Sequence, residues 1–375
     1  MGESDKLQQA IKYSRQKELL WVFSTLAGIC INVLAILLGL PMLLWRFLDE
    51  RVPARLRLPA FVTILSTLDW LISLPIAFYS GYILEWRYNL STQRLRHWLL
   101  DQLKVHTLSV AFGVPLVTSF YQVVRRWPRR WWLIVSAAML PFTALLSELF
   151  PVLIAPLFNR YEPIKDPDLE SELRQLASRE GVEISRVMRM DMSRRTKKSN
   201  AFFTGLGRNR RIVLADTLLD QFPKDEIEAV VAHELGHQVR RDTWKMVGIS
   251  SLATTLSMFL LSRIFPVANR LLPSRYRDKE LSSPANMPLL GLLLQLITLV
   301  GMPLINAYSR RVEYAADEYA VRVTRKPEAL ISALQRLQKS NLVDPDPPLI
   351  TKVLLHSHPS IKDRVNRIRE IAHQQ

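Results

Sequence analysis

Long, nearly uncharged apolar runs alternate along the chain with short polar segments, and six of the runs are candidates for membrane-spanning helices. Four lie before residue 159 and two after residue 245. The runs cover residues 19–45, 58–84, 105–124, 131–158, 246–261 and 287–308. The first is longer than the apolar region of a signal peptide, which has roughly 7–15 residues. Because a soluble protein rarely carries six such runs, the pattern predicts a mainly α-helical, polytopic membrane bundle of about six spans.

The polar segment 159–245 has the pattern of a small α+β unit inserted between spans four and five. Residues 166–181 predict an amphipathic helix, with aspartate at its start and glycine just past its end. Residues 182–192 alternate apolar and polar positions like a half-buried strand. Residues 199–216 predict a hairpin with glycines in the turn, and a further helix is expected to begin near Pro223.

Beyond the sixth run, the pattern predicts three short helices that begin near Arg310, Pro327 and Pro359. The chain therefore divides into four expected parts. These are an N-terminal membrane domain (1–158), a polar α+β core (159–245), two further spans (246–308) and a helical C-terminal part (309–375).

The net charge of +16 is concentrated beside the apolar runs, for example in residues 51–57 and 125–130. Arginine and lysine at such positions anchor spans against anionic lipid headgroups, so we expect a lipid bilayer and no nucleic acid as a partner. Both sides of the predicted bundle are basic, and charge alone does not orient it. The single cysteine, Cys30, allows no disulfide within the chain.

The sequence "HELGH" places His233 and His237 four residues apart, on one face of a helix. Two imidazoles at this spacing can bind one zinc ion, with Glu234 placed to act on a water molecule. A chance match and an exposed polar helix face are the alternatives. The apolar residues that flank the motif favour a buried site.

A catalytic zinc site needs a third protein ligand. The extended pattern with a third histidine is excluded because Arg240 and Thr243 stand at its glycine and histidine positions. A later helix offers Glu313 as the ligand and Asp317, one turn on, as a hydrogen-bond acceptor for a ligand histidine. A solvated acidic face is the alternative for this pair. Asp242 falls on a different part of the helix face and is the less favoured ligand.

Several segments together resemble the type I CAAX prenyl proteases, a family of integral-membrane zinc metalloproteases. They are "HELGHQVRRD", "SRRVEYAADEYA", "NAFFTGLGRNRRIVLADTLL" and "HSHPSIKDRVNRI". The stretches "EWRYNLSTQRLRHWLLDQLK" and "FPVLIAPLFNRYEPIKD" also match, and the likeness covers roughly residues 79–369.

The resemblance implies a gluzincin-type catalytic unit with one zinc ion per chain. His233, His237 and Glu313 would be the zinc ligands, Glu234 the general base and Asp317 a supporting carboxylate. It also implies a large water-filled chamber between the membrane helices, with the site and both termini in the cytoplasm.

Further positions match the family outside the zinc motif. Asn200 and Ala201 correspond to a strand whose edge pairs with the substrate backbone. His358 corresponds to a histidine that stabilises the oxyanion. Arg364 corresponds to a basic residue near the active site, which we assign to substrate binding.

We therefore expect a membrane-embedded zinc endopeptidase of the plasma, inner or ER-type membrane, acting on membrane-associated or CAAX-like peptides and proteins. Eukaryotic members have seven spans against the six predicted here. A quality-control protease like HtpX is the alternative, but that family has fewer spans and no counterpart of residues 85–93. A non-catalytic scaffold is disfavoured because Glu234 is present. The oligomeric state stays open.

Overall fold

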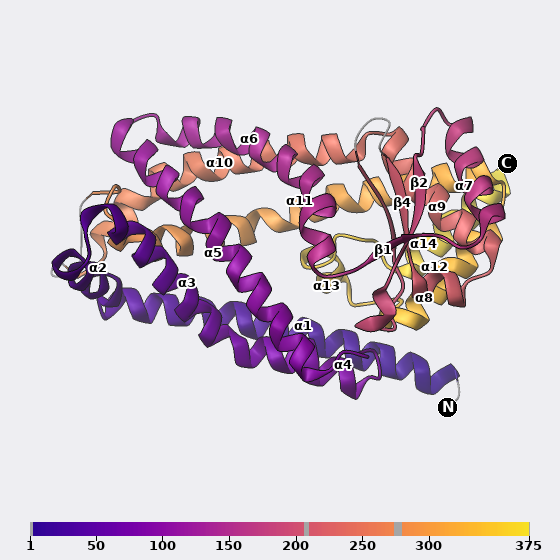
Figure 1. Ribbon diagram of the computed structural model, residues 1–375, viewed down its shortest axis with the longest axis horizontal. Coiled ribbons are helices and arrows are strands. Elements are labelled where there is room, and N and C mark those ends of the chain that lie inside the picture. Colours follow the sequence, from indigo (N-terminus) through magenta and orange to yellow (C-terminus); the bar gives the residue numbers. More distant parts are fainter. Residues whose placement is uncertain (1–2, 206–209, 274–279, 375) are drawn as a thin grey trace.

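The computed structural model describes residues 3–205, 210–273 and 280–374, and six helical segments within them are long and apolar enough to cross a membrane. They are Ser4–Leu37, Ala54–Arg87, Leu95–Arg126, Trp131–Leu157, Asp242–Arg270 and Pro284–Thr324. The predicted number of spans is confirmed. Figure 1 shows the spans as an elongated bundle, with the small mixed α/β unit at one end.

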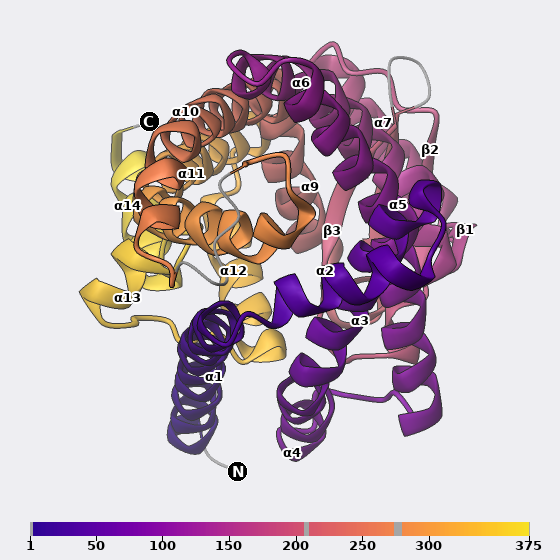
Figure 2. The same cartoon turned by 90° about the vertical axis from the view of Figure 1, so that its left-hand side faces the viewer.

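The six long helices form a closed ring. They are α1 (Glu3–Leu37), α3 (Ala54–Phe78), α5 (Leu95–Arg126), α6 (Trp131–Leu149), α10 (Asp242–Arg270) and α11 (Met287–Thr324). Each contacts two neighbours, in the order α1, α11, α10, α6, α5, α3 and back to α1. The ring is seen end-on in Figure 2. Mutual packing of this kind leaves the outer apolar faces for lipid.

The first uncharged run, 19–45, is not a single helix. The helix α1 ends at Leu37, and α2 (Leu40–Arg51) starts after Gly39, whose φ of 71° is left-handed. Glycine adopts this conformation without steric cost, and Pro41 then suits the first turn of the new helix. With 12 residues, α2 is roughly 18 Å long and too short to cross a bilayer.

Two spans end in irregular helical turns near the α/β unit. The second continues from α3 through the π-helix Tyr79–Ile83 into α4 (Leu84–Arg87). The fourth continues from α6 through a π-turn at Phe150–Ile154 and a 3-10 turn at Ala155–Leu157. In the fourth span, Pro151 and Pro156 lack the amide hydrogen that a regular α-helix requires.

A four-stranded sheet in the order β1-β2-β4-β3 forms the centre of the α/β unit. Its strands are β1 (Tyr161–Pro163), β2 (Arg186–Met190), β3 (Ala201–Thr204) and β4 (Arg211–Ala215). The pairs β1–β2 and β3–β4 are antiparallel, whereas β2 and β4 are parallel. The helices around it are α7 (Pro167–Arg179), α8 (Asp216–Gln221) and α9 (Lys224–Val239). Because β3 is an edge strand that packs against α9, its open edge lies beside the histidine helix.

Most elements expected in this unit are present. The helix α7 is capped by Asp166, whose side chain accepts a 3.0 Å hydrogen bond from the Leu169 amide. The predicted strand 182–192 is confirmed over residues 186–190, and the predicted hairpin pairs β3 with β4. Residues 206–209 of its turn lie outside the described residues. The short strand β1 was not predicted.

The C-terminal part contains α12 (Pro327–Asn341), α13 (Leu349–Leu354) and α14 (Ile361–Gln374). The helices expected near Pro327 and Pro359 are confirmed, but the prediction of a separate helix beginning near Arg310 is wrong. There α11 continues without a break from the membrane span to Thr324. Residues 304–324 contain no glycine or proline, so the backbone has no reason to leave the helix.

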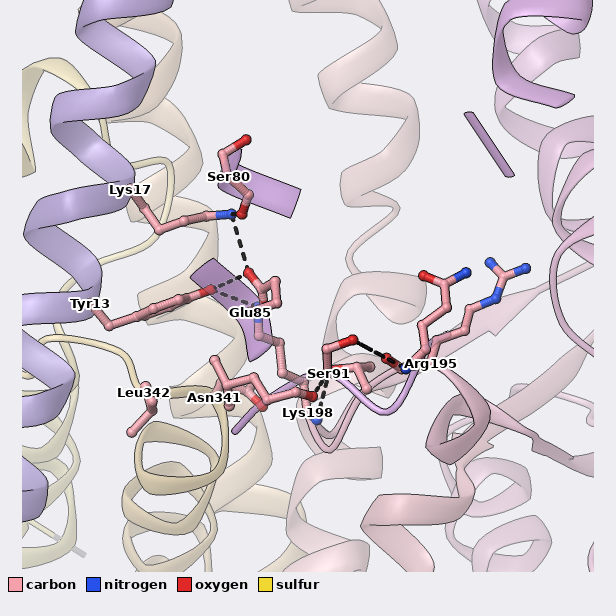
Figure 3. A network of polar contacts seen from close by, with 12 residues as sticks. Tyr13, Lys17, Ser80, Glu85, Ser91, Arg195, Lys198, Asn341 and Leu342 are labelled. Carbon is pink, nitrogen blue, oxygen red and sulfur yellow. Dashed lines mark hydrogen bonds and ion pairs between the residues drawn. The ribbon is translucent and has the colours of Figure 1, made fainter. Parts of the chain in front are cut away.

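A polar network ties the membrane helices to the α/β unit. Figure 3 shows Tyr13, Lys17 and Lys198 converging on the carboxylate of Glu85. The Tyr13 hydroxyl donates at 2.5 Å, and the ammonium groups of Lys17 and Lys198 lie 3.2 and 2.9 Å away. Lys198 stands three residues before β3. The network therefore joins α1 and the end of the second span to the segment that leads into the edge strand.

Candidate active site

The helix α9 carries the histidine pair and is packed between β3, α7, α11 and α12. Its contact with α11 depends on Gly236, because a Cβ atom there would lie 3.0 Å from the ring of Tyr319. The absence of a side chain at this position lets the two helices approach closely. Side chains of α9 and α11 can therefore contact one another.

Three side chains on these two helices form a candidate metal centre. One ligand atom each from His233, His237 and Glu313 lies within 4.8 Å of the others. The Nε2 atom of His233 is 3.4 Å from Oε2 of Glu313, and Nε2 of His237 is 3.6 Å from Oε1. The three residues predicted as ligands are brought together.

This arrangement fits a zinc ion. Ligand atoms about 2.0–2.1 Å from a tetrahedrally coordinated ion are separated by about 3.3 Å, close to the two nitrogen–oxygen distances found here. Two imidazole nitrogens and one carboxylate also match the donor set of catalytic zinc sites. The donors therefore suit zinc in both chemistry and spacing.

Both histidines have a second carboxylate at their other ring nitrogen. Nδ1 of His233 is 2.9 Å from Asp317, and Nδ1 of His237 is 3.2 Å from Asp242. A hydrogen bond from Nδ1 leaves Nε2 free to bind metal. The chain thus provides a carboxylate partner for each ligand histidine.

The role of Asp242 was missed by sequence reasoning, which considered it only as a metal ligand. Between α9 and α10, Arg241 adopts a left-handed φ of 56°, and this turn brings Asp242 back against His237. Asp242 is almost fully buried, and its charge is balanced by Lys245 at 3.0 Å. The sequence signal is an acidic residue three positions past the end of the motif helix.

Arg364 lies behind the centre and is buried. Its guanidinium forms two hydrogen bonds with the Asp317 carboxylate, of 2.7 and 2.5 Å. A third nitrogen lies 3.7 Å from Glu313. A bidentate pair of this kind fixes both partners in orientation. The guanidinium therefore contacts the acidic residues of the site, next to the predicted ligands.

Glu234 lies between the two histidines in sequence and is partly buried. Burial raises the pKa of its carboxyl to about 7, with His233 acting in the opposite direction. A carboxyl group that titrates near neutral pH can both accept and donate a proton under physiological conditions. This is the behaviour expected of a general base that later acts as an acid.

The two histidines differ in pKa. Burial acts to lower the pKa of His233, but hydrogen bonds to Asp317 and Glu313 outweigh it and raise the pKa to about 9. For His237, burial and the neighbouring His233 charge lower the pKa. The two imidazoles therefore differ in their affinity for a proton.

His358 reaches the centre from the C-terminal part. Its Nε2 atom lies 3.4 Å from Oε1 of Glu313, while its side chain remains mostly exposed. Nδ1 of the same ring is 3.0 Å from the Ser357 hydroxyl. An exposed imidazole beside a ligand carboxylate can contact a molecule that enters the site.

Asn200 and Ala201 lie at the start of the edge strand. The carbonyl of Asn200 accepts a 2.9 Å hydrogen bond from the Ala215 amide, and its side chain accepts one from the Ala201 amide. Ala201 pairs with Leu214 of β4 and is buried. The outer edge of β3 is unpaired within the sheet formed by the described strands, so strand addition is geometrically open.

Two family models match the chain and together cover nearly all of it. The model for peptidase family M48 matches residues 163–372. The model described as the CAAX prenyl protease N-terminal region, with five membrane helices, matches residues 2–160. Within that range, the described residues contain four candidate spans and the shorter helix α2.

Relatives and a solved structure agree with these matches. Metalloprotease YhfN of Bacillus subtilis is 31% identical, over 96% of this chain and 84% of its own. CAAX prenyl protease 1 of Saccharomyces cerevisiae is 27% identical, over 98% of this chain and 86% of its own. The crystal structure of S. mikatae Ste24p superposes with a TM-score of 0.88 at 27% identity, covering 98% of this chain and 90% of that one.

Proposed function

This chain belongs to peptidase family M48, and on that premise we propose that it hydrolyses peptide bonds with a zinc ion held by His233, His237 and Glu313. It is an integral membrane protein and a metalloendopeptidase, as the two family matches and the relatives support. One observation carries the assignment of the site. Both Nε2 atoms face the Glu313 carboxylate, while each Nδ1 atom faces a different carboxylate.

When bound, zinc would lower the pKa of water and polarise the scissile carbonyl group. Glu234 would remove a proton from the attacking water and deliver it to the nitrogen of the departing amine. Burial of this carboxyl, which raises its pKa to about 7, suits both halves of the transfer. We assign Asp317 and Asp242 the role of fixing the two histidine rings.

Other residues would act on the substrate. The edge of β3 at Asn200 and Ala201 would pair with an extended peptide through backbone hydrogen bonds. His358 would donate a hydrogen bond to the carbonyl oxygen as it gains negative charge. Arg364, which the resemblance assigned to substrate binding, would instead act through Asp317 and Glu313, because its buried guanidinium lies against both carboxylates.

We propose membrane-associated or CAAX-like peptides and proteins as substrates. The names of the relatives and the N-terminal match over residues 2–160 support this class over the quality-control alternative. We further propose a cytoplasmic site, a chamber within the helix ring, and division of the chain into parts 1–158, 159–245, 246–308 and 309–375. The apolar run 287–308 of α11 ends five residues before Glu313, which supports placing the site at a membrane surface.

Peptide cleavage in detergent tests this function. Glu234→Gln keeps the side-chain volume but cannot accept the proton, so kcat should fall about 10²–10⁴-fold with metal content unchanged. Asp225→Asn, an exposed carboxylate on the same helix, is the matched control. Near-normal turnover by Glu234→Gln would remove it from the general-base role.

A further inference from the structure

The short helix α13 presents an unusually exposed apolar face. The exposed fractions of Leu349, Ile350, Val353 and Leu354 are 76%, 68%, 40% and 41%. Their spacing along the helix places them on one side. A patch of this kind on an amphipathic segment indicates a surface for a membrane or another protein.

The charged residue of α13 points toward the protein instead. The ammonium of Lys352 lies 2.8 Å from Asp346 and 2.9 Å from Asp363, and its side chain is only 17% exposed. Its positive charge is therefore neutralised on the inner side of the helix. The outer side keeps no charge that would oppose contact with hydrocarbon.

Contacts with two spans place α13 at the level of the membrane surface. On α11, the Asn306 side chain donates to the Leu354 carbonyl at 3.0 Å, and Arg310 donates to the carbonyl groups of Lys352 and His356. On α1, Glu18 lies 3.1 Å from the His356 ring. Glu18 directly precedes the first apolar run, and Arg310 follows the last run by two residues. Both spans thus change from apolar to charged where they contact this segment.

Figure 2 shows α13 at the outer rim of the helix ring, beside α1 and α14. We propose that α13 is a membrane-interface anchor, whose apolar face lies at the boundary between lipid headgroups and acyl chains. Lipid is favoured over a second copy of the chain because one face of a six-residue helix provides far less than the roughly 1,200–2,000 Å² that a stable interface buries. The spans it contacts also expose apolar side chains close by in sequence, Leu304 (78% exposed) two residues before Asn306 and Leu19 (60% exposed) directly after Glu18.

The anchor supports a functional loop. Leu354 ends the helix, and His358 follows four residues later with its ring 3.4 Å from Glu313. Lipid contact would hold this loop over the site from outside, as Asn306 and Arg310 hold it from within. This second step rests on the proposed function of His358, whereas the lipid contact itself does not.

Depth measurement tests the lipid contact without any need for activity. In full-length Cys30→Ser protein reconstituted in phosphatidylcholine–phosphatidylglycerol vesicles, a fluorophore is attached at Ile350→Cys. We expect brominated acyl chains to quench it at least about twofold more than the same label at Glu328→Cys, an exposed position on α12. Quenching by aqueous iodide but not by bromolipid would overturn the proposal. Cross-linking between two Ile350→Cys chains in vesicles would instead assign the face to a second copy.

Turnover in vesicles tests the support of His358. Ile350→Asn should lower kcat about tenfold, because a small displacement of a catalytic loop is costly, and Ile350→Leu should restore it. Metal content should be equal in all three proteins. An unchanged kcat in Ile350→Asn would refute the support of the loop. If the wild type cleaves no peptide, the proposed protease function is refuted. The depth measurement still tests whether α13 contacts lipid.

Discussion

The Oδ1 atom of Asp317 lies 2.9 Å from Nδ1 of His233, although the two residues belong to different helices. Asp317 has no exposed surface, and Arg364 pairs with it through two hydrogen bonds. A buried carboxylate of this kind is tolerated only because its charge is paired. The contact fixes the His233 ring with Nε2 directed at Glu313. The metal centre therefore depends on a buried chain of contacts that runs from α14 through α11 to α9.

Asp317→Asn should weaken metal binding by about 10–100-fold, because it loses the charged acceptor that orients His233. Zinc affinity can be measured by competition with a chelator in detergent. Asp363→Asn is the matched control, since this carboxylate lies on α14 and pairs with Lys352 outside the centre. Equal affinity in Asp317→Asn and wild type would exclude a supporting role for Asp317.

Metal binding should release a proton from His233. The metal-free residue has a pKa of about 9 and is protonated at pH 8, whereas a ligand imidazole must be neutral. Zinc affinity should therefore rise with pH up to about 9, by about tenfold per unit for this one proton.

Comparison of the wild type with Asp317→Asn isolates the proton of His233, because any proton lost from bound water is common to the two proteins. Since the substitution removes the interaction that raises the His233 pKa, calorimetry in two buffers at pH 8 should show release of up to one proton fewer in Asp317→Asn. Equal proton release in the two proteins contradicts this assignment.

The features visible in the sequence are those set by local patterns. Apolar runs of sufficient length identified six spans, since a bilayer imposes the length of each span. The spacing of His233 and His237 placed both rings on one face of α9. Glu313 and Asp317 were found because they stand one turn apart on a helix. Each inference needed only the period of the helix.

The missed features depend on contacts between distant segments. The parallel pairing of β2 with β4 and the added strand β1 join segments that no local pattern relates. Asp242 reaches His237 only because Arg241 reverses the chain in a left-handed conformation. Glu85 is one carboxylate at the end of a span, and its side-chain partners Tyr13, Lys17 and Lys198 lie 68 or more residues away. Geometry of this kind follows from tertiary packing rather than from sequence spacing.

Loss of the Glu85 charge should loosen the link between the membrane helices and β3. Glu85→Gln keeps the side-chain shape but leaves Lys17 and Lys198 without their carboxylate, so we expect about 1–3 kcal/mol of destabilisation. Because Lys198 leads into the edge strand, KM should rise more than kcat falls. Thermal unfolding in detergent and steady-state kinetics measure the two effects. Glu50→Gln, at an exposed position, is the control, and identical behaviour of the two variants would show that the network is dispensable.

Proline substitution in the substrate tests how a peptide lies against the site. If an extended substrate pairs with the edge of β3, main-chain hydrogen bonds provide most of the recognition and sequence selectivity should be loose. Proline has no backbone donor, so it should block cleavage at those substrate positions whose amide pairs with the strand. A peptide series with proline moved one position at a time should show alternating blocked and tolerated positions. Tolerance of proline at every position would exclude pairing with β3.

His358 should act on the transition state more than on substrate binding. Its exposed ring lies beside Glu313 and is available to a carbonyl oxygen that gains charge only during the reaction. His358→Ala should therefore lower kcat by about 10²–10³-fold with little change in KM, the pattern of an interaction made only in the transition state. His373→Ala, near the C-terminal end of α14, controls for the loss of a histidine elsewhere. Because His358 is not a predicted ligand, metal content should stay at one ion per chain, and an effect confined to KM would assign the residue to substrate binding instead.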